Sequence, residues 1–257
     1  MRILSLPIAI LLAACVYIPF PRTAARVADA VRALYGRFLL LFTRKSGKTD
    51  EQLAFPLFLL VFGGACQLIG GLHMLLAALV LAPVFSALSL LPQAARAKEE
   101  LDSGALSSNI AEYEAKVRSL CAALGPAFAT DMVAPMLLYA LGAPIHMGCV
   151  LTSAYLAARA LHDAHSAAMR TVRVIGIPCA AVTRGLLLLC SCVVGKNPLH
   201  AKGDTLRELM LSILDLTTGS ANSRDPVAGD ITQAVFLLCF VSAFLCAALV
   251  VALVSFC

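Results

Sequence analysis

The sequence predicts an all-α protein, a polytopic integral membrane bundle of about five spans with cytoplasmic amphipathic helices. Apolar residues make up 60% of its 257 positions, charged residues only 14%, and the mean hydropathy is +0.88. A soluble domain typically carries roughly a quarter charged residues. Three long stretches lack charge altogether, at 53–92, 132–158 and 231–257. The composition therefore excludes an extended soluble enzyme, a disordered protein and a DNA-binding domain.

The apolar runs divide into spans because one membrane helix needs about twenty residues. We expect spans at about 3–20, 53–69, 72–91 and 231–257. Gly70–Gly71 is the expected turn between the second and third spans. Gly63–Gly64 is either a competing break or a close contact between helices.

Two further apolar segments each allow two interpretations. Residues 132–158 are interrupted at 142–144 by Gly-Ala-Pro, which predicts either a kinked span or a re-entrant pair of short helices. Residues 174–194 contain Arg184 near their middle. They form either a span with a functional arginine or an interfacial segment whose arginine snorkels to the surface.

Positive charges follow the first apolar run. Residues 21–50 contain Arg22, Arg26, Arg32, Arg37, Arg44, Lys45 and Lys48, opposed by Asp29 and Asp50. This clustering places the segment in the cytoplasm and the chain in the inner (plasma) membrane as a multi-pass protein. There is no tryptophan and no aromatic interleaving of the kind that binds nucleic acid, so we expect no nucleic-acid partner. The expected partner is the lipid bilayer, and homo-oligomerisation stays open.

The polar segments are 21–52, 93–131, 159–173 and 195–230. Within 93–131, Asn109 and Glu112 have capping-box spacing, and two i,i+4 pairs (Glu112/Lys116 and Glu114/Arg118) predict a solvated helix of about twelve residues. Within 195–230, a helix is expected to begin at Asp204 or Thr205 and to end near Gly219. Its apolar positions are Leu206, Leu209, Met210, Ile213 and Leu214.

Sequence motifs for chemistry are few. Nine of the ten cysteines lie within or at the end of apolar runs, where cysteine behaves as a small hydrophobe. No Walker loop, zinc-ligand spacing or nucleophile elbow is present. His162 and His165 can share a helix face near Asp163, but no spacing fixes a further ligand, so we assign no metal site.

The order of features nevertheless resembles the CobD/CbiB family of cobalamin biosynthesis and its AmpE relatives. The resemblance covers most of the chain in layout, and its motifs are DMVAPMLLYALGAP at 131–144 and IPCAAVTRGLLL at 177–188. In the family, an acidic motif precedes V-x-A-P. The residues that match are Val133, Ala134 and Pro135 at the apolar end of this motif, Gly142 and Pro144 of the turn, and Ile177 and Pro178 of I-P.

The chain departs from the family pattern at its polar motifs. Where E-N-x-x-D-G stands in the family, residues 126–131 contain only Asp131 as an acid. Where N-T-L-D stands, residues 153–156 read Ser-Ala-Tyr-Leu, with 161–163 (Leu-His-Asp) as a shifted remnant. The arginine expected just after Pro178 is absent, and Arg184 follows six residues on.

The resemblance implies ATP-dependent amide formation on a corrinoid carboxylate, with Mg²⁺ and ATP as cofactors. Asp131, Asp163 and Arg184 would then be catalytic, and Arg159 and His162 would bind substrate, around a cytoplasm-facing cavity near 142–144. The alternative is a non-catalytic, AmpE-like membrane regulator or scaffold. A third hypothesis, a small transporter, has only the broken span and Arg184 in its favour. Convergence of the acidic and basic residues on one water-accessible cavity favours the enzyme, and their dispersal favours the scaffold.

Overall fold

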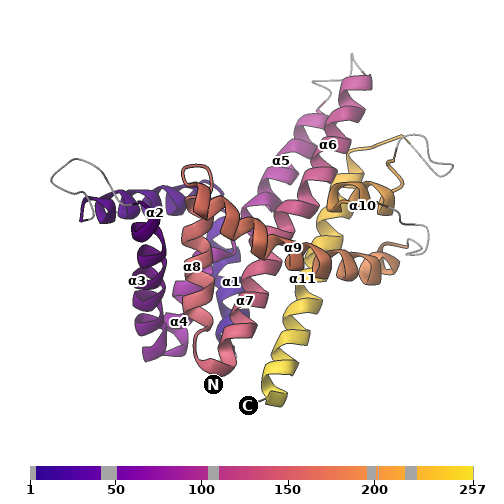
Figure 1. The fold of residues 1–257 in the computed structure, drawn as a ribbon. Coiled ribbons are helices and arrows are strands. Elements are labelled where there is room, and N and C mark those ends of the chain that lie inside the picture. Colours follow the sequence, from indigo (N-terminus) through magenta and orange to yellow (C-terminus); the bar gives the residue numbers. More distant parts are fainter. Residues whose placement is uncertain are drawn as a thin grey trace.

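The computed structural model describes residues 4–41, 51–103, 110–195, 201, 203–217 and 225–256, and within these ranges all regular structure is helical. The predicted all-α fold is thus confirmed (Figure 1). The helices are α1 (Ser5–Tyr17), α2 (Thr23–Leu40), α3 (Glu51–Leu72), α4 (Met74–Leu81), α5 (Leu90–Asp102), α6 (Ile110–Phe128), α7 (Ala134–Gly142), α8 (Gly148–Ala160), α9 (Ser166–Cys190), α10 (Leu206–Ile213) and α11 (Gly229–Phe256).

The described helices include four that are long and apolar enough to cross a membrane. They cover Leu53–Leu72, Ile110–Ile145, Ser166–Val193 and Gly229–Ser255. A fifth is counted if Met74–Val84 and Ser86–Leu101, which meet at a bend of 56°, form one span. The chain is therefore a multi-pass membrane bundle with about the expected number of spans.

Charge separates the two ends of this bundle. No Asp, Glu, Lys or Arg occurs in 53–95, 132–158 or 231–257. These segments supply the α3–α4 junction, the α7–α8 turn and the far end of α11, which lie together at the bottom of Figure 1. Most of the charged residues in the described part of the chain lie on α2, α5, α6, α9, α10 and the last turn of α8. We call the end of the bundle that carries these charged helices the cation-rich end. The end formed by the α3–α4 junction, the α7–α8 turn and the far end of α11 is the uncharged end.

Glycines in α3 make contacts rather than a turn. The helix continues through the expected turn at Gly70–Gly71 and ends at Leu72, and His73 caps α4 by accepting from the Leu75 amide at 3.2 Å. A Cβ on Gly70 would lie 3.2 Å from the Cα of Ala77 in α4. A Cβ on Gly63 would lie 3.0 Å from the Val150 carbonyl oxygen in α8. The turn between α3 and α4 therefore lies at His73, just after the predicted Gly70–Gly71 position, and Gly70 instead allows close packing against α4.

The third expected span, 72–91, is broken. α4 ends at Leu81, and two 3₁₀ turns, Ala82–Val84 and Ser86–Ser89, precede α5. Pro83 lacks an amide proton and cannot continue the helix. The Tyr17 hydroxyl, at the end of α1, donates to the Pro83 carbonyl at 3.0 Å and so supplies a partner at the bend.

Of the two alternatives predicted for 132–158, the structure shows a pair of short helices, α7 and α8, and not a kinked span. α6 continues through a wide turn into α7, and the chain then reverses at 143–147 so that α8 returns beside α7. Only Gly fits this reversal, because a Cβ on Gly142 would lie 2.8 Å from the backbone of Gly148. The second half of the polar segment 93–131 is also not solvated, since its residues Val117, Cys121, Leu124 and Phe128 are buried in the main core.

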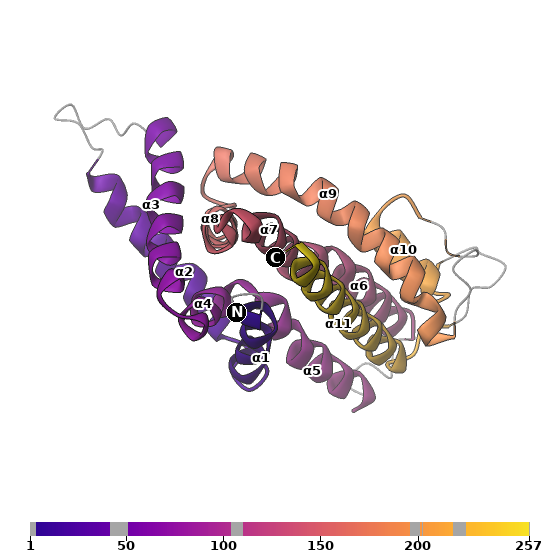
Figure 2. The ribbon, with the colours of Figure 1, turned by 90° about the horizontal axis from the view of Figure 1, so that it is seen from below.

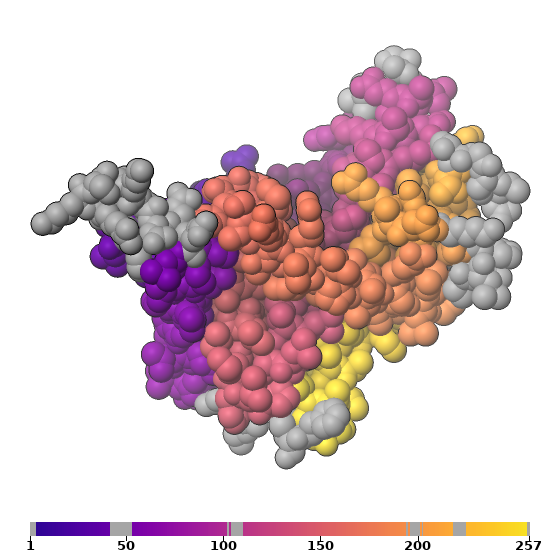
Figure 3. All heavy atoms as spheres, in the orientation of Figure 1, coloured from indigo at the N-terminus to yellow at the C-terminus, as the bar shows by residue number. Residues whose placement is uncertain are grey.

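Two helices lie crosswise at the cation-rich end. Figure 2 shows α8 end-on while α2 and α9 are seen lengthwise, and in Figure 1 both run across the end of α8. A small core of Val31, Tyr35, Phe55, Phe58, Ala157, Ala158, Leu161 and Ala168 joins them to α3 and α8. The orientation of α9 favours the interfacial alternative for 174–194. The α5–α6 hairpin projects beyond them (Figure 3).

The α3–α8 contact predicts different effects for two neighbouring glycines. Gly63→Leu places a side chain against the Val150 backbone and should lower the free energy of unfolding by about 1–3 kcal/mol, as overpacking does. Gly64→Leu is the matched control, because a Cβ there meets nothing within 4 Å. Thermal unfolding in detergent measures both variants. Equal stability of the two would contradict the close α3–α8 approach.

The charge separation predicts opposite accessibility for the two ends. α11 has 28 residues, about 42 Å at 1.5 Å per residue, which exceeds a hydrocarbon core of about 30 Å. In a variant without native cysteines, Asp163→Cys and Ser255→Cys should react with an impermeant maleimide from opposite sides of sealed vesicles. Labelling of both from one side would refute this arrangement.

Candidate functional site: a buried ion pair at a π turn

A π turn lies where the sequence resembles V-x-A-P. Residues Ala129–Val133 form one turn of π-helix between α6 and α7, and the Ala134 amide donates to the Ala129 carbonyl, five residues back. Two residues on, Pro135 has no amide proton, and its ring would clash with the Asp131 carbonyl in a regular α-helix. The wider turn relieves that clash. Such turns recur at functional sites, so this one identifies the candidate site.

The π turn leaves one carbonyl without an amide donor. In the i→i+5 pattern, the Thr130 carbonyl would accept from residue 135, which is proline. The Tyr155 hydroxyl of α8 donates to this carbonyl at 3.0 Å. Tyr155 is buried beside Ala134 of α7 and Cys179 of α9. One side chain thus satisfies the open backbone and joins three helices.

Asp131 projects from the same turn into an ion pair with Arg159. The Asp131 side chain is 11% exposed and that of Arg159 32% exposed. The Thr130 hydroxyl lies 3.0 Å from Asp131 Oδ1 and 3.1 Å from the Ala127 carbonyl, so its one proton is shared between acceptors. A buried carboxylate is costly unless it is paired, and Arg159 supplies the opposite charge.

Tyr155 and Arg159 act from one face of α8. They are four residues apart and so lie one above the other on a helix. The first contacts the backbone of the π turn and the second its carboxylate. The sequence analysis identified Arg159 and Asp131 but missed Tyr155 and Thr130. The sequence did contain a signal for Tyr155. Pro135 cannot donate a backbone hydrogen bond, so a carbonyl before it needs another donor, and Tyr155 lies one helical turn before Arg159.

The other predicted site residues lie elsewhere. His162 and Asp163 follow the end of α8, with His162 Nδ1 3.0 Å from Asp163 Oδ1, and the Asp163 side chain is 96% exposed. The Arg184 guanidinium donates to the Asp204 carbonyl at 3.3 Å. The structure therefore brings Asp131 and Arg159 together and directs the remaining three side chains to other partners or to solvent. Their roles in catalysis stay predictions.

The residues around Asp131 do not fit a magnesium ion. Mg²⁺ prefers oxygen ligands from carboxylates and phosphates, but the Asp131 carboxylate already faces a guanidinium. Within the described ranges, no three His, Cys, Asp or Glu side chains are placed to hold a metal. His165, which shares a predicted helix face with His162 as a candidate metal ligand, stacks on Phe55 with ring centroids 4.8 Å apart. The site as built is an electrostatic link between α7 and α8.

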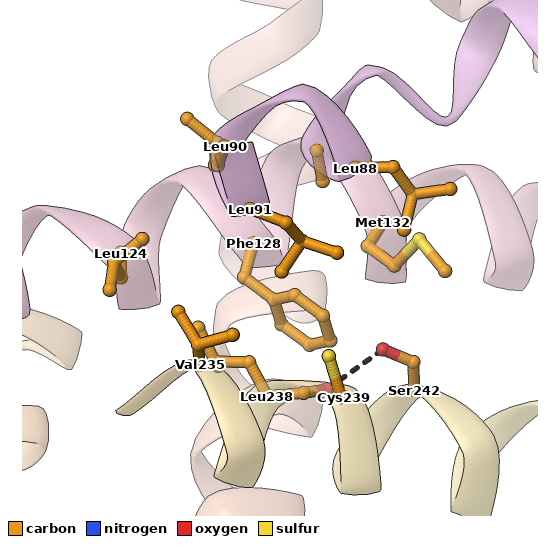
Figure 4. A pocket seen from close by; sticks show the side chains of 11 residues that line it. Leu88, Leu90, Leu91, Leu124, Phe128, Met132, Val235, Leu238, Cys239 and Ser242 are labelled. Carbon is orange, nitrogen blue, oxygen red and sulfur yellow. Dashed lines mark hydrogen bonds between the residues drawn. The ribbon is translucent and has the colours of Figure 1, made fainter. Parts of the chain in front are cut away.

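A separate apolar pocket lies between the beginning of α5, α6 with its π turn, and α11 (Figure 4). Leu88, Leu91, Phe128, Met132, Leu238 and Cys239 are among its lining residues. Met132 belongs to the π turn, next to Asp131 in sequence. None of the five predicted site residues lines this pocket.

No family model matches the chain, and no curated protein or solved structure is significantly similar.

The ion pair predicts a non-additive double-mutant cycle. Asp131→Leu or Arg159→Met alone leaves one charge without its partner and should lower the free energy of unfolding by about 3 kcal/mol. The double variant Asp131→Leu/Arg159→Met removes both charges and should cost much less than the sum of the single changes. Unfolding in detergent measures all of these.

Asp29→Ala is the control for this cycle. It breaks the exposed Asp29–Arg32 pair on α2, whose side chains are 65% and 49% exposed. The expected change is under about 1 kcal/mol. Additive effects of the Asp131 and Arg159 substitutions would show that the two charges do not interact.

Proposed function

We propose that this protein is a non-catalytic, AmpE-like scaffold of the inner (plasma) membrane, with its cation-rich end in the cytoplasm. The observation that carries the proposal is the internal use of Asp131. The one acid that remains in the family-like motif is paired with Arg159 and linked to Thr130. The Asp131 carboxylate is therefore used in contacts within the protein and not in contact with a ligand.

The alternative function, ATP-dependent amide formation, needs metal-binding acids and free basic groups that this site does not bring together. Activation of a carboxylate as an acyl phosphate requires acids to hold Mg²⁺ and free basic groups to neutralise the transferring phosphoryl charge. Asp163 is almost fully exposed, and Arg184 is bonded to the Asp204 carbonyl. Because these side chains do not converge on one cavity, their positions support the scaffold.

The surface of the cation-rich end supports a binding role. The α5–α6 hairpin projects from it and is joined by the Glu100–Lys116 pair at 3.8 Å, while Glu114 and Arg118 pair along α6 at 3.3 Å. Ile110, at the beginning of α6, is 72% exposed. A projecting helical hairpin that carries charged side chains of both signs is suited to contact a second protein.

A divergent cobinamide-phosphate synthase-like enzyme is the second candidate. In its favour, Asp131 and Arg159 were both assigned to the site from sequence, and the structure pairs them. On this hypothesis the substrate is a corrinoid, Mg²⁺ and ATP are required, and the ion pair must open for the acid to act. Homo-oligomerisation is compatible with either candidate.

Complementation separates the two candidates. In a strain that lacks the cobinamide-phosphate step, we expect no restored growth from the wild-type chain, although immunoblotting finds it in the membrane fraction. Restored growth that Asp131→Asn abolishes, with the variant still present in the membrane, would refute the scaffold and establish the enzyme. Asp29→Ala is the matched control for an acid in an exposed pair.

A further inference from the structure

The α9 helix exposes most of its surface. One face packs on the bundle and contains the buried residues Cys179, Thr183, Leu187 and Cys190. Only 28% of its most apolar 18-residue stretch is buried inside the protein. Figure 2 shows α9 along an outer edge of the molecule. The rest of the helix must therefore suit a medium outside the protein.

The exposed part of α9 is divided between arginines and apolar side chains. Arg170, Arg173 and Arg184 are exposed and lie on one side of the helix, because three and fourteen residues correspond to about one and four helical turns. We call these three residues the arginine face. Val182 and Leu189, two turns apart and 37% and 59% exposed, lie on a neighbouring side. A helix in the membrane plane places its apolar side at the acyl chains and its cations at the headgroups.

The arginine face has no acid on its own helix, because α9 contains neither Asp nor Glu. Arg170 and Arg173 form no ion pair with any residue in the described part of the chain. Arg184 donates to a backbone carbonyl, that of Asp204, which does not neutralise its charge. A guanidinium binds phosphate oxygens with paired N–H donors. The arginine face therefore suits a phosphate-bearing anion at the membrane surface.

The α2 helix presents a second arginine surface at the same end of the bundle. It also lies crosswise there (Figure 2). Its exposed Arg26 and Arg37 are eleven residues apart, about three helical turns, and so share one side of the helix. Its one acid, Asp29, is paired with Arg32. Two crosswise helices with unpaired arginines match anions that are spread over a plane, as lipid headgroups are.

We propose that the arginine face of α9 binds the headgroups of anionic phospholipids, with Arg170 and Arg173 donating to their phosphate oxygens. Anionic lipids give the cytoplasmic leaflet a negative surface potential, and each arginine near it strengthens attraction roughly fivefold. Lipid is favoured over an acidic protein because acyl chains also cover the apolar side at Val182 and Leu189. The inference rests on the crosswise position of α9 and holds for a scaffold and for an enzyme alike.

Native mass spectrometry of the purified, delipidated protein in detergent tests the proposal. Phosphatidylglycerol and phosphatidylcholine with identical acyl chains are titrated separately, because both contain a phosphate but only the first has a net negative charge. We expect the first phosphatidylglycerol to bind at a concentration about tenfold lower than the first phosphatidylcholine, as two unpaired arginines imply. Equal binding of the two lipids would overturn the proposal and favour an acidic protein as the partner.

Matched variants test the arginine face itself. Arg170→Gln/Arg173→Gln should reduce the preference for phosphatidylglycerol about fivefold or more, whereas Arg170→Lys/Arg173→Lys keeps both charges and should retain it. Arg96→Gln/Arg207→Gln is the control, because it removes the same charge from exposed positions on α5 and α10, helices that also carry acids. Thermal unfolding in detergent checks that each variant is folded. An unchanged preference in Arg170→Gln/Arg173→Gln, or an equal loss in the control, would refute the arginine face as the binding surface.

Discussion

The structure depends on one constraint, that backbone polar groups in lipid must find partners within the protein. Two breaks in the helices, each next to a proline, show how this constraint is met. At one, the Tyr17 hydroxyl donates to the Pro83 carbonyl, and at the other the Tyr155 hydroxyl donates to the Thr130 carbonyl, each at 3.0 Å. In both places a tyrosine hydroxyl from a neighbouring helix donates to a backbone carbonyl at the break. These bonds require α1 to lie against the α4–α5 bend and α8 against the π turn, so they also define which helices are neighbours.

The Asp131–Arg159 pair adds a charge constraint to the same contact. A buried pair of this kind contributes little net stability compared with apolar residues, yet either charge alone is strongly unfavourable. Its effect is thus on arrangement: α7 and α8 can separate only if both charges are exposed together. Tyr155 lies one turn from Arg159 and requires the same register. A hairpin that carries Gly142 and Gly148 at its tip and this pair near its other end has little freedom to slide.

The sequence predicted those elements whose signal is local. Helix α10 begins after Thr205, one of the two expected starting residues, and Glu114 and Arg118 form the expected pair. The apolar segment from Ile231 lies in α11. The failures concern partners that are distant in sequence. Gly70 has the same local appearance in a turn as in a tight contact with Ala77. Pro135 indicates a disturbed helix, but which hydroxyl satisfies it depends on the fold.

Composition alone is also a poor guide to α9, and the reason bears on function. Its residues Ser166–Val193 satisfy the length and hydropathy of a span, yet the helix crosses the end of α8. Arg170, Arg173 and Arg184 are exposed on it, as are Val174 and Ile177. A helix that presents arginines beside apolar side chains is stable at the interface, where each group meets its preferred medium. The α2 helix, with three exposed arginines, lies crosswise at the same end. The bundle therefore places its charged surface along the membrane plane, and a partner of the α5–α6 hairpin would meet that surface as well as the hairpin.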